Sequence, residues 1–562
     1  MPSTRLGPGG TRSCFCLLLA CFSAANFCPV RVTAAEVDTC SLAGSVRDSL
    51  TGAPLRTKVV LLPAGGRTTY MTATDSAGAF SFDSVEPGNY RIELQNAGYR
   101  SEPGNQAGAL THLSPGQKIA GLELTAVPLG AISGTILDAE GEPLVGAEVQ
   151  LIRSKWSHGR RVVSLVQVPR RFFEQLVLTD DLGRYRLDSL EPGEYFVRAQ
   201  TLPGWFNIET VSDGPGQPEM ATIPMFYPRA VTIAGATPVR VGAGQEISGI
   251  DLRLPIVRTF HIRGSANPAP TDTITNRAPY VAASHDDGGV KDWAEFFGQF
   301  GEDGSFDIAG VPAGNYVVRE MQGSEALSDQ VRTSVNSGDV NGVRLSSTRF
   351  DVGIQVRFEG DASHDLSRVF AHLVPTDRIG ATLSTWPNHP GVISNVSPGR
   401  YILEVSPDEN AHVKQLLVHG KEVTSADFQL DGAADQLEIV LAKGTRTICG
   451  TFAWPDPRPI GVRAILVPEK PRPGGFTIVH QADIDQSGEF TFWSVSPGRY
   501  RSFVVTDFDE GLWENRDFFR LVSDRGLLVE VPEGAKDNSA IRISPALLPP
   551  AAVERAMAQM RN

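Results

Sequence analysis

The sequence has few cysteines, no excess of positive charge and, beyond its N-terminus, no long apolar run. Only 6 of 562 residues are cysteine, and the first 35 residues hold four of them. The other two, Cys40 and Cys449, cannot form the disulfide framework of a small secreted domain, and two separate thiols are favoured over one long bridge. A formal charge of −13 argues against nucleic acid as a partner. After the N-terminus no stretch has the roughly 20 apolar residues of a membrane-spanning helix.

Residues 1–35 are predicted to be an export signal. Two arginines precede the apolar segment Cys14–Ala24, and small residues offer cleavage after Ala25 or Ala34. We therefore expect a periplasmic, cell-surface or secreted protein. An alternative interpretation takes Cys21 as a lipidated N-terminal residue that anchors the chain to a membrane.

Internal repetition organises the rest of the chain. The element Pro-Gly-x-Tyr follows a hydrophobic residue in four copies and has one inserted residue in another; its tyrosines are Tyr90, Tyr195, Tyr316, Tyr401 and Tyr500. Their spacings of 105, 121, 85 and 99 residues match one small β-sandwich per copy. We expect each tyrosine to close one end of its sandwich and to hydrogen-bond backwards along the chain, as in a tyrosine corner.

An Asp-rich turn with a glycine precedes most copies of this element and leads into a strand of alternating apolar and polar residues. An example is Thr179-Asp180-Asp181-Leu182-Gly183, followed by Arg184–Leu187. About seven short strands per copy predict an all-β chain, a tandem array of about five Greek-key β-sandwich domains of prealbumin or Ig-like type. The expected limits of the five domains are 36–128, 129–258, 259–347, 348–443 and 444–545, followed by a C-terminal tail at 546–562. The second domain carries insertions, and the fourth is degenerate. Helical signal is nearly absent outside Pro550–Met560.

The combined pattern resembles the carboxypeptidase regulatory-like domain family. In the second copy Ile132-Ser133-Gly134-Thr135-Ile136 is followed by Gly141-Glu142-Pro143-Leu144-Val145-Gly146-Ala147, and then by the Asp turn and Pro-Gly-x-Tyr. Copies one and five match in part, and copies three and four mainly in their turns and closing strands. The resemblance implies exported bacterial β-sandwiches of prealbumin-like topology, related in shape to starch-binding and collagen-adhesin repeats. It brings no catalytic residues.

Chemical motifs are scarce. A zinc carboxypeptidase needs His-x-x-Glu with a distant histidine, and the one match, His419 to Glu422, lies in a predicted hairpin. Asp483–Gly488 resembles half of a calcium loop, but Ser494 stands where the bidentate glutamate is required. We predict no catalytic residue, no metal site and no cofactor.

A Lys–Asn isopeptide crosslink of the collagen-adhesin kind is also disfavoured. Glu320 lies where the assisting glutamate would be, but the third copy has only Lys291, which falls in a loop-like stretch and not in a first strand.

Aromatic residues in insertions are the candidate binding residues. Copy two carries Trp156, Trp205 and Phe206, and copy five carries Trp513 and Phe518 after its Pro-Gly strand. On loops at a sandwich end they could stack on sugar rings or dock a partner. The alternative is that they cover a domain junction or an open edge strand.

These observations favour a rod of sandwiches that serves as a non-catalytic scaffold or protein-interaction module at the cell envelope. The second hypothesis is a carbohydrate-binding protein that uses the aromatic loops of copies two and five, so the expected partners are a polysaccharide or another envelope protein. An enzyme has only the His419 turn in its favour.

Overall fold

The fold was analysed in a computed structural model of the chain. It describes residues 39–561 except 64–67, 102–109, 167–175, 202–209, 213, 215–216, 268, 270–277, 287–289, 292–294, 323–324, 327, 329, 347, 360–368, 377–382, 385–390, 407–410, 426, 433–434, 456–461, 471–473, 476–478, 486, 507–509 and 534–539. The predicted export signal and the Cys21 alternative lie outside the described residues.

Five β-sandwiches follow one another along the chain, and each is built around its first strand. In sandwich 1, β1 (Cys40–Asp48) pairs antiparallel with β4 (Ala79–Val85) and parallel with the closing strand β8 (Lys118–Pro128). The first strands of sandwiches 2 to 5 have the same two kinds of neighbour: β9 (Gly130–Leu137), β20 (Ile256–Asn267), β29 (Phe350–Phe358) and β38 (Arg446–Thr451). The chain is therefore an all-β tandem array, as predicted.

The remaining elements complete these sandwiches. Sandwich 1 also has β2 (Lys58–Pro63), β3 (Tyr70–Ala73), β5 (Gly88–Gln95), β6 (Tyr99–Ser101) and β7 (Leu110–Leu113). Sandwich 2 has β10 (Glu148–Ser157), β11 (Arg160–Leu165), β12 (Arg184–Leu190), β13 (Gly193–Gln200), β14 (Thr210–Val211), β15 (Glu219–Thr222), β16 (Met225–Phe226), the 3₁₀ turn η1 (Ile233–Gly235), β17 (Val239–Val241), β18 (Glu246–Ile247) and β19 (Leu252–Arg253). Sandwich 3 has β21 (Tyr280–His285), β22 (Val290–Lys291), β23 (Phe296–Gln299), β24 (Ser305–Val311), β25 (Gly314–Gln322), β26 (Glu325–Ala326), β27 (Val331–Val335) and β28 (Val340–Ser346).

Sandwich 4 has β30 (Phe370–Pro375), β31 (Leu383–Ser384), β32 (Val392–Val396), β33 (Gly399–Ser406), β34 (Ala411–Val418), β35 (Lys421–Glu422), β36 (Phe428–Leu430) and β37 (Gln436–Lys443). Sandwich 5 has β39 (Arg463–Pro468), β40 (Gly474–Gly475), β41 (His480–Asp483), β42 (Glu489–Val495), β43 (Gly498–Val505), α1 (Glu510–Glu514), α2 (Arg516–Val522), the 3₁₀ turn η3 (Ser523–Arg525), β44 (Leu527–Val531), β45 (Ile541–Ile543) and α3 (Pro550–Arg561).

The repeated tyrosine forms the predicted corner in every sandwich. Each hydroxyl donates to the carbonyl four residues earlier, at 2.6–2.9 Å: Tyr90 to Glu86, Tyr195 to Glu191, Tyr316 to Pro312, Tyr401 to Ser397 and Tyr500 to Ser496. All five side chains are buried. The bond satisfies a hydroxyl that burial alone would destabilise, so a large ring can fill the end of the core.

The Asp-rich turns also form as predicted. Asp180 Oδ1 accepts hydrogen bonds from the amides of Leu182 at 3.0 Å and Arg184 at 2.7 Å, and Gly183 closes the turn with φ of 68°. Such a turn aligns the following strand with the first strand of its sandwich, because the carboxylate fixes the chain reversal.

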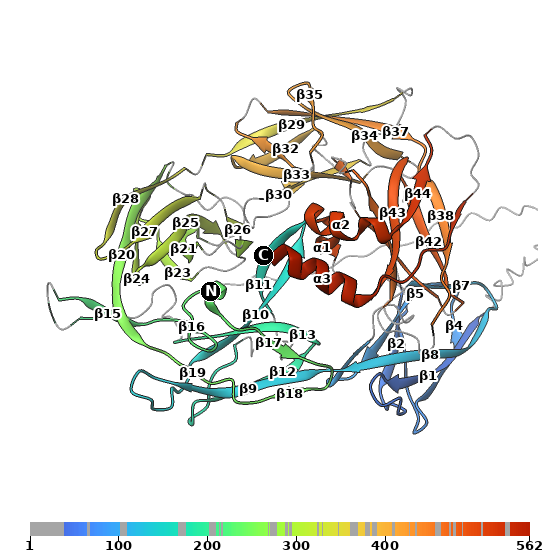
Figure 1. Cartoon of the computed structure of the whole chain (residues 1–562), viewed down its shortest axis with the longest axis horizontal. Helices are drawn as coiled ribbons and strands as arrows, with labels where there is room; N and C mark the ends of the chain where they lie inside the picture. Colours follow the sequence, from blue (N-terminus) through green and yellow to red (C-terminus); the bar gives the residue numbers. More distant parts are fainter. Residues whose placement is uncertain are drawn as a thin grey trace, which may run out of the picture.

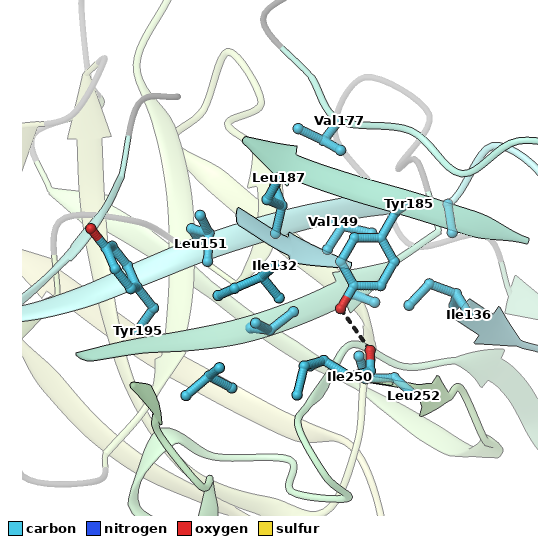
Figure 2. Packing of buried hydrophobic residues seen from close by; sticks show 14 of the residues in the cluster. Ile132, Ile136, Val149, Leu151, Val177, Tyr185, Leu187, Tyr195, Ile250 and Leu252 are labelled. Carbon is cyan, nitrogen blue, oxygen red and sulfur yellow. Dashed lines mark hydrogen bonds between the residues drawn. The ribbon is translucent and has the colours of Figure 1, made fainter. Parts of the chain in front are cut away.

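Alternating apolar residues of the two sheets meet in one core per sandwich. Figure 2 shows the core of sandwich 2, where Tyr185 donates to the carbonyl of Ile250 at 2.6 Å. Gly134 lies beside Ile250, between β18 and β19, and a Cβ at Gly134 would clash with the backbone of Ile250. The glycine at this position is thus required by the close approach of two backbones.

The array is curved, and this corrects the expectation of a rod. In Figure 1 the sandwiches follow a turning path, and the helices of sandwich 5 lie next to β10 and β11 of sandwich 2. The cause is an intramolecular contact between segments more than 350 residues apart, at Gly159 and Asn515.

The C-terminal residues predicted as a tail include α3, which packs through Ala552 and Ala556 on sandwich 5.

Both cysteines of the described residues, Cys40 and Cys449, are free thiols. Within the described part of the chain, no helix combines the length and the apolar character needed to cross a membrane.

Candidate functional site at the domain junctions

The β10–β11 hairpin of sandwich 2 is the segment that meets sandwiches 4 and 5. Its turn is formed by His158 and Gly159, both with positive φ, of 49° and 72°. Gly159 donates its amide to the carbonyl of Gly511 at 3.1 Å and accepts from the side-chain amide of Asn515 at 2.7 Å. The hairpin tip is therefore held by the backbone of α1 and by the residue that caps α2.

A hydrophobic cluster receives the hairpin. The outer face of the β39–β43 sheet is covered by α1, α2 and α3, and Trp156 packs against this cluster from sandwich 2. Trp513 contacts Phe518 edge to face with ring centroids 5.2 Å apart, and Phe503 at 5.0 Å. Burial of these rings stabilises the helices, which are too short to be stable alone.

Polar contacts surround the hairpin tip. His158 lies with Nδ1 3.3 Å from Glu514 Oε2 and Nε2 4.0 Å from Glu404 Oε1, so its ring stands between sandwiches 4 and 5. Arg160 donates to the carbonyl of Thr376 at 2.5 Å and to Asp427 at 3.1 Å, both in sandwich 4.

Two carboxylates at this junction have shifted pKa values. Burial raises the pKa of Glu404, and the nearby Glu514 raises it further, while His158 opposes the shift. The hydrogen bonds from Arg400 lower the pKa of Asp427, and the charge of Arg160 adds to this effect. Glu404 is therefore the group at the junction whose charged form is disfavoured by its surroundings.

A second junction joins sandwiches 2 and 3. β15 of sandwich 2 pairs antiparallel with β20 of sandwich 3, and β22 of sandwich 3 pairs parallel with β11. These pairings cover edge strands, which would otherwise expose unpaired backbone groups.

Arg198 is buried at the second junction. It donates to Gln150 at 2.6 Å and to Gln200 at 2.8 Å, and burial lowers its pKa although Glu295 of sandwich 3 and Glu148 oppose the shift. A small pocket here is lined by Arg198, Ile223, Pro224, Val231, His285, Glu295, Phe296 and Pro312. The arrangement balances a buried cation of one sandwich with a carboxylate of the next.

Three of the five aromatic residues predicted as binding residues lie among the described residues. Trp513 and Phe518 are 2% and 0% exposed inside the cluster, and Trp156 is partly buried against it. Trp205 and Phe206 lie outside the described residues. Trp513 and Phe518 thus lie in two helices that fold over a sheet face and not in the predicted loop, at a domain junction as in the alternative interpretation.

Several junction residues were not predicted from the sequence. Arg198 sits in Tyr195-Phe196-Val197-Arg198-Ala199, where every residue is buried. A run of buried residues without exposed positions is typical of a strand whose sheet is covered on both faces. This run is therefore the sequence feature from which burial of Arg198 could be predicted. Glu404 lies in a similar run, Tyr401-Ile402-Leu403-Glu404-Val405, whereas His158 lies in a hairpin turn and carries no such signal.

The residues of the candidate chemical motifs serve turns or ion pairs. His419, at the tip of the β34–β35 hairpin, contacts Asp435 through Nε2, and Glu422 is exposed. Asp485 Oδ1 accepts from the amide of Glu489 at 2.7 Å, and Glu320 pairs with Arg349 at 3.4 Å. Among the described residues, no group of three or more His, Cys, Asp or Glu is placed to hold a metal ion.

Comparison with known proteins bears on the first sandwich. Residues 41–109 match the carboxypeptidase regulatory-like domain family. The resemblance predicted from the sequence is thus confirmed there, in a regulatory-like domain that contains β1 to β6. No curated protein matches the chain in sequence.

Three solved structures have a remote similarity to the chain. The Bacillus anthracis TIE protein has 13% identity and a TM-score of 0.15, with 69% of each chain covered. A minor pilin of Streptococcus agalactiae has 13% identity and a TM-score of 0.21, covering 42% of this chain and 99% of its own. A shaft pilin of Lactobacillus rhamnosus GG has 11% identity and a TM-score of 0.19, covering 39% and 98%. Scores this low leave the function undecided.

Proposed function

We propose that this chain is an exported, non-catalytic scaffold or protein-interaction module of the cell envelope, built from five domains with the limits expected from the sequence. The observation that carries the proposal is that insertions in two of the sandwiches contact each other. The outer part of the β10–β11 hairpin, from Trp156, lies in an insertion of sandwich 2, and the helices after β43 lie in an insertion of sandwich 5; these two insertions contact each other. Intramolecular docking of this kind fixes the relative positions of domains, which is what a scaffold requires.

Electrostatics and side-chain use support the same proposal. The tyrosines and aspartates that repeat along the chain hold turns, and the charged residues at the junctions pair between sandwiches. The formal net charge of the whole sequence is −13, which disfavours phosphate-rich partners and leaves proteins or neutral polymers as the expected class.

Carbohydrate binding remains a prediction for Trp205 and Phe206. Trp156, Trp513 and Phe518 contribute to the junction cluster, so a sugar would have to displace them from their packing. A glycan array with the chain lacking residues 1–35 tests the alternative. Binding that is lost in Trp205→Ala, with an unchanged melting temperature, would favour it over the scaffold.

Export and lack of catalysis are tested with the full-length chain expressed in a bacterial host. We expect the envelope fraction to contain protein whose intact mass corresponds to a start between Asn26 and Glu36, without lipid. A diacylglyceryl group on Cys21 would establish the anchored alternative. Turnover of peptide, ester or glycoside substrates that His419→Ala abolishes would contradict the non-catalytic proposal.

A further inference from the structure

His261 occupies an unusual position at the junction of sandwiches 2 and 3. It lies on β20, and both of its ring nitrogens face carboxylates that come from different strands. Nδ1 is 2.6 Å from Asp307 Oδ1 on β24, and Nε2 is 3.2 Å from Glu219 Oε2 on β15. The side chain is 16% exposed. Because β15 belongs to sandwich 2, the imidazole bridges two sandwiches.

Hydrogen bonding at both nitrogens requires two protons. A neutral imidazole carries one N–H and one lone pair, so one of its nitrogens would direct a lone pair at a carboxylate oxygen. The imidazolium donates at both sides. The geometry therefore favours the charged ring whenever Glu219 and Asp307 are ionised.

The other charges around His261 lead to the same conclusion. Arg263 on β20 donates to Asp307 at 2.9 Å and to Asp339 at 2.7 Å, and Asp339 accepts from the backbone amide of His261 at 3.1 Å. Arg263 thus offsets part of the charge of Asp307 and Asp339 and by itself lowers the pKa of His261, while the imidazolium offsets the negative charge that remains on the three carboxylates. Burial by itself lowers the pKa of His261, but its hydrogen bonds to Asp307 and Glu219 outweigh this effect, and the net pKa is raised.

We propose that His261 is a pH-sensitive clip that holds the β15 strand of sandwich 2 onto the edge of sandwich 3. Glu219 is the first residue of β15, and its register partner on β20 is Thr259. When the ring loses its second proton, the Glu219 end of the strand loses a charge-assisted bond while the backbone pairing at Ala221 and Thr222 remains. The clip therefore controls fraying of the junction and not the fold of either sandwich.

The direction of the pH dependence follows from linkage. Since the pKa of His261 is raised in the folded protein, its stabilisation is fully present below the pKa of the unfolded chain and is lost as pH rises through the folded pKa. An exported protein meets the external pH directly, so the junction would be tighter in mildly acidic than in alkaline surroundings.

Hydrogen–deuterium exchange of the amides in residues 217–223 tests the clip in the full chain. After correction for the intrinsic rate at each pH, we expect protection at the Glu219 end of β15 to fall as pH rises from about 5.5 to 9, while protection at Ala221 and Thr222 is retained, because a histidine titrates in this range. In His261→Gln the protection should be low and independent of pH. The matched control is His419→Gln, which removes a histidine–aspartate pair within sandwich 4 and should behave like the wild type at β15.

A second variant keeps the test decisive if His261→Gln fails to fold. Glu219→Gln leaves the histidine in place but removes one carboxylate, so the midpoint of the protection profile should move to lower pH. An identical midpoint in Glu219→Gln, or an unchanged pH profile in folded His261→Gln, would overturn the proposal. Neither outcome bears on export or catalysis, so the scaffold proposal is tested separately.

Discussion

Replacing Trp156 with alanine should weaken the docking of sandwich 2 on sandwich 5. Trp156 packs on the cluster that contains Trp513 and Phe518, and truncation of a fully buried tryptophan costs about 3–5 kcal/mol. Because Trp156 is partly buried and the tip contacts of Gly159 remain, we expect a loss of about 1–3 kcal/mol.

The loss should be visible as a lower melting temperature of the transition that includes sandwich 5. For a domain of this size, 1 kcal/mol corresponds to a decrease in Tm of about 4–8 °C. Differential scanning calorimetry of the chain lacking residues 1–35 measures it. The matched control is Trp493→Ala, because Trp493 is 71% exposed on β42 of the same sandwich. That variant should stay within about 0.5 kcal/mol of the wild type.

The comparison separates packing from ligand binding. If Trp156→Ala melts like the wild type, the indole does not hold the junction, and the contact between β10 and the helices is not a source of stability. Loss of sugar binding at an unchanged Tm would then assign Trp156 to the carbohydrate hypothesis.

Three further changes test the repeat and the junction. Tyr195→Phe should destabilise sandwich 2 by about 0.5–1.5 kcal/mol in urea unfolding, because the carbonyl of Glu191 loses its donor; an unchanged midpoint would exclude the corner as a stabilising bond. Gly134→Ala should lower the free energy of unfolding by about 1–3 kcal/mol in the same assay, because its Cβ meets the neighbouring backbone. A more stable variant would show that the two segments separate easily. Glu404 has a raised pKa, so its contribution to stability declines as pH rises through that pKa. Glu404→Gln should remove this decline from the Tm measured between about pH 4 and 8. Parallel curves of Tm against pH for variant and wild type would contradict the assignment.

The repeated unit could be predicted from the sequence because its determinants are local. The corner tyrosines bond four residues back, and Asp180 bonds two and four residues ahead. A motif of that length carries its own hydrogen-bond partner, so it is readable wherever it occurs. The alternating strands that follow then define one face of each core.

The junctions could not be predicted in the same way. The contact of Gly159 with Asn515 spans 356 residues, and nothing near either residue indicates the other. The sequence predicts a loop where α1 and α2 form, because each helix is shorter than eight residues and so cannot show a repeating helical pattern. Their stability depends on the sheet beneath them and on Trp156, which are tertiary partners.

The β10–β11 hairpin of sandwich 2 closes the array by docking on the helices of sandwich 5. Small-angle X-ray scattering of the Gly511→Leu variant tests this docking most directly. Leucine favours the helix more than glycine does, so α1 itself should persist, but a Cβ at residue 511 would clash with the backbone of Trp156 and Ser157. Gly338→Leu, where no atom lies within 4 Å of the added Cβ, is the control. We predict a larger maximum dimension and radius of gyration for Gly511→Leu than for the wild type and the control. If all three proteins give the same extended distance distribution, the chain is a rod in solution and the account of a closed array is contradicted.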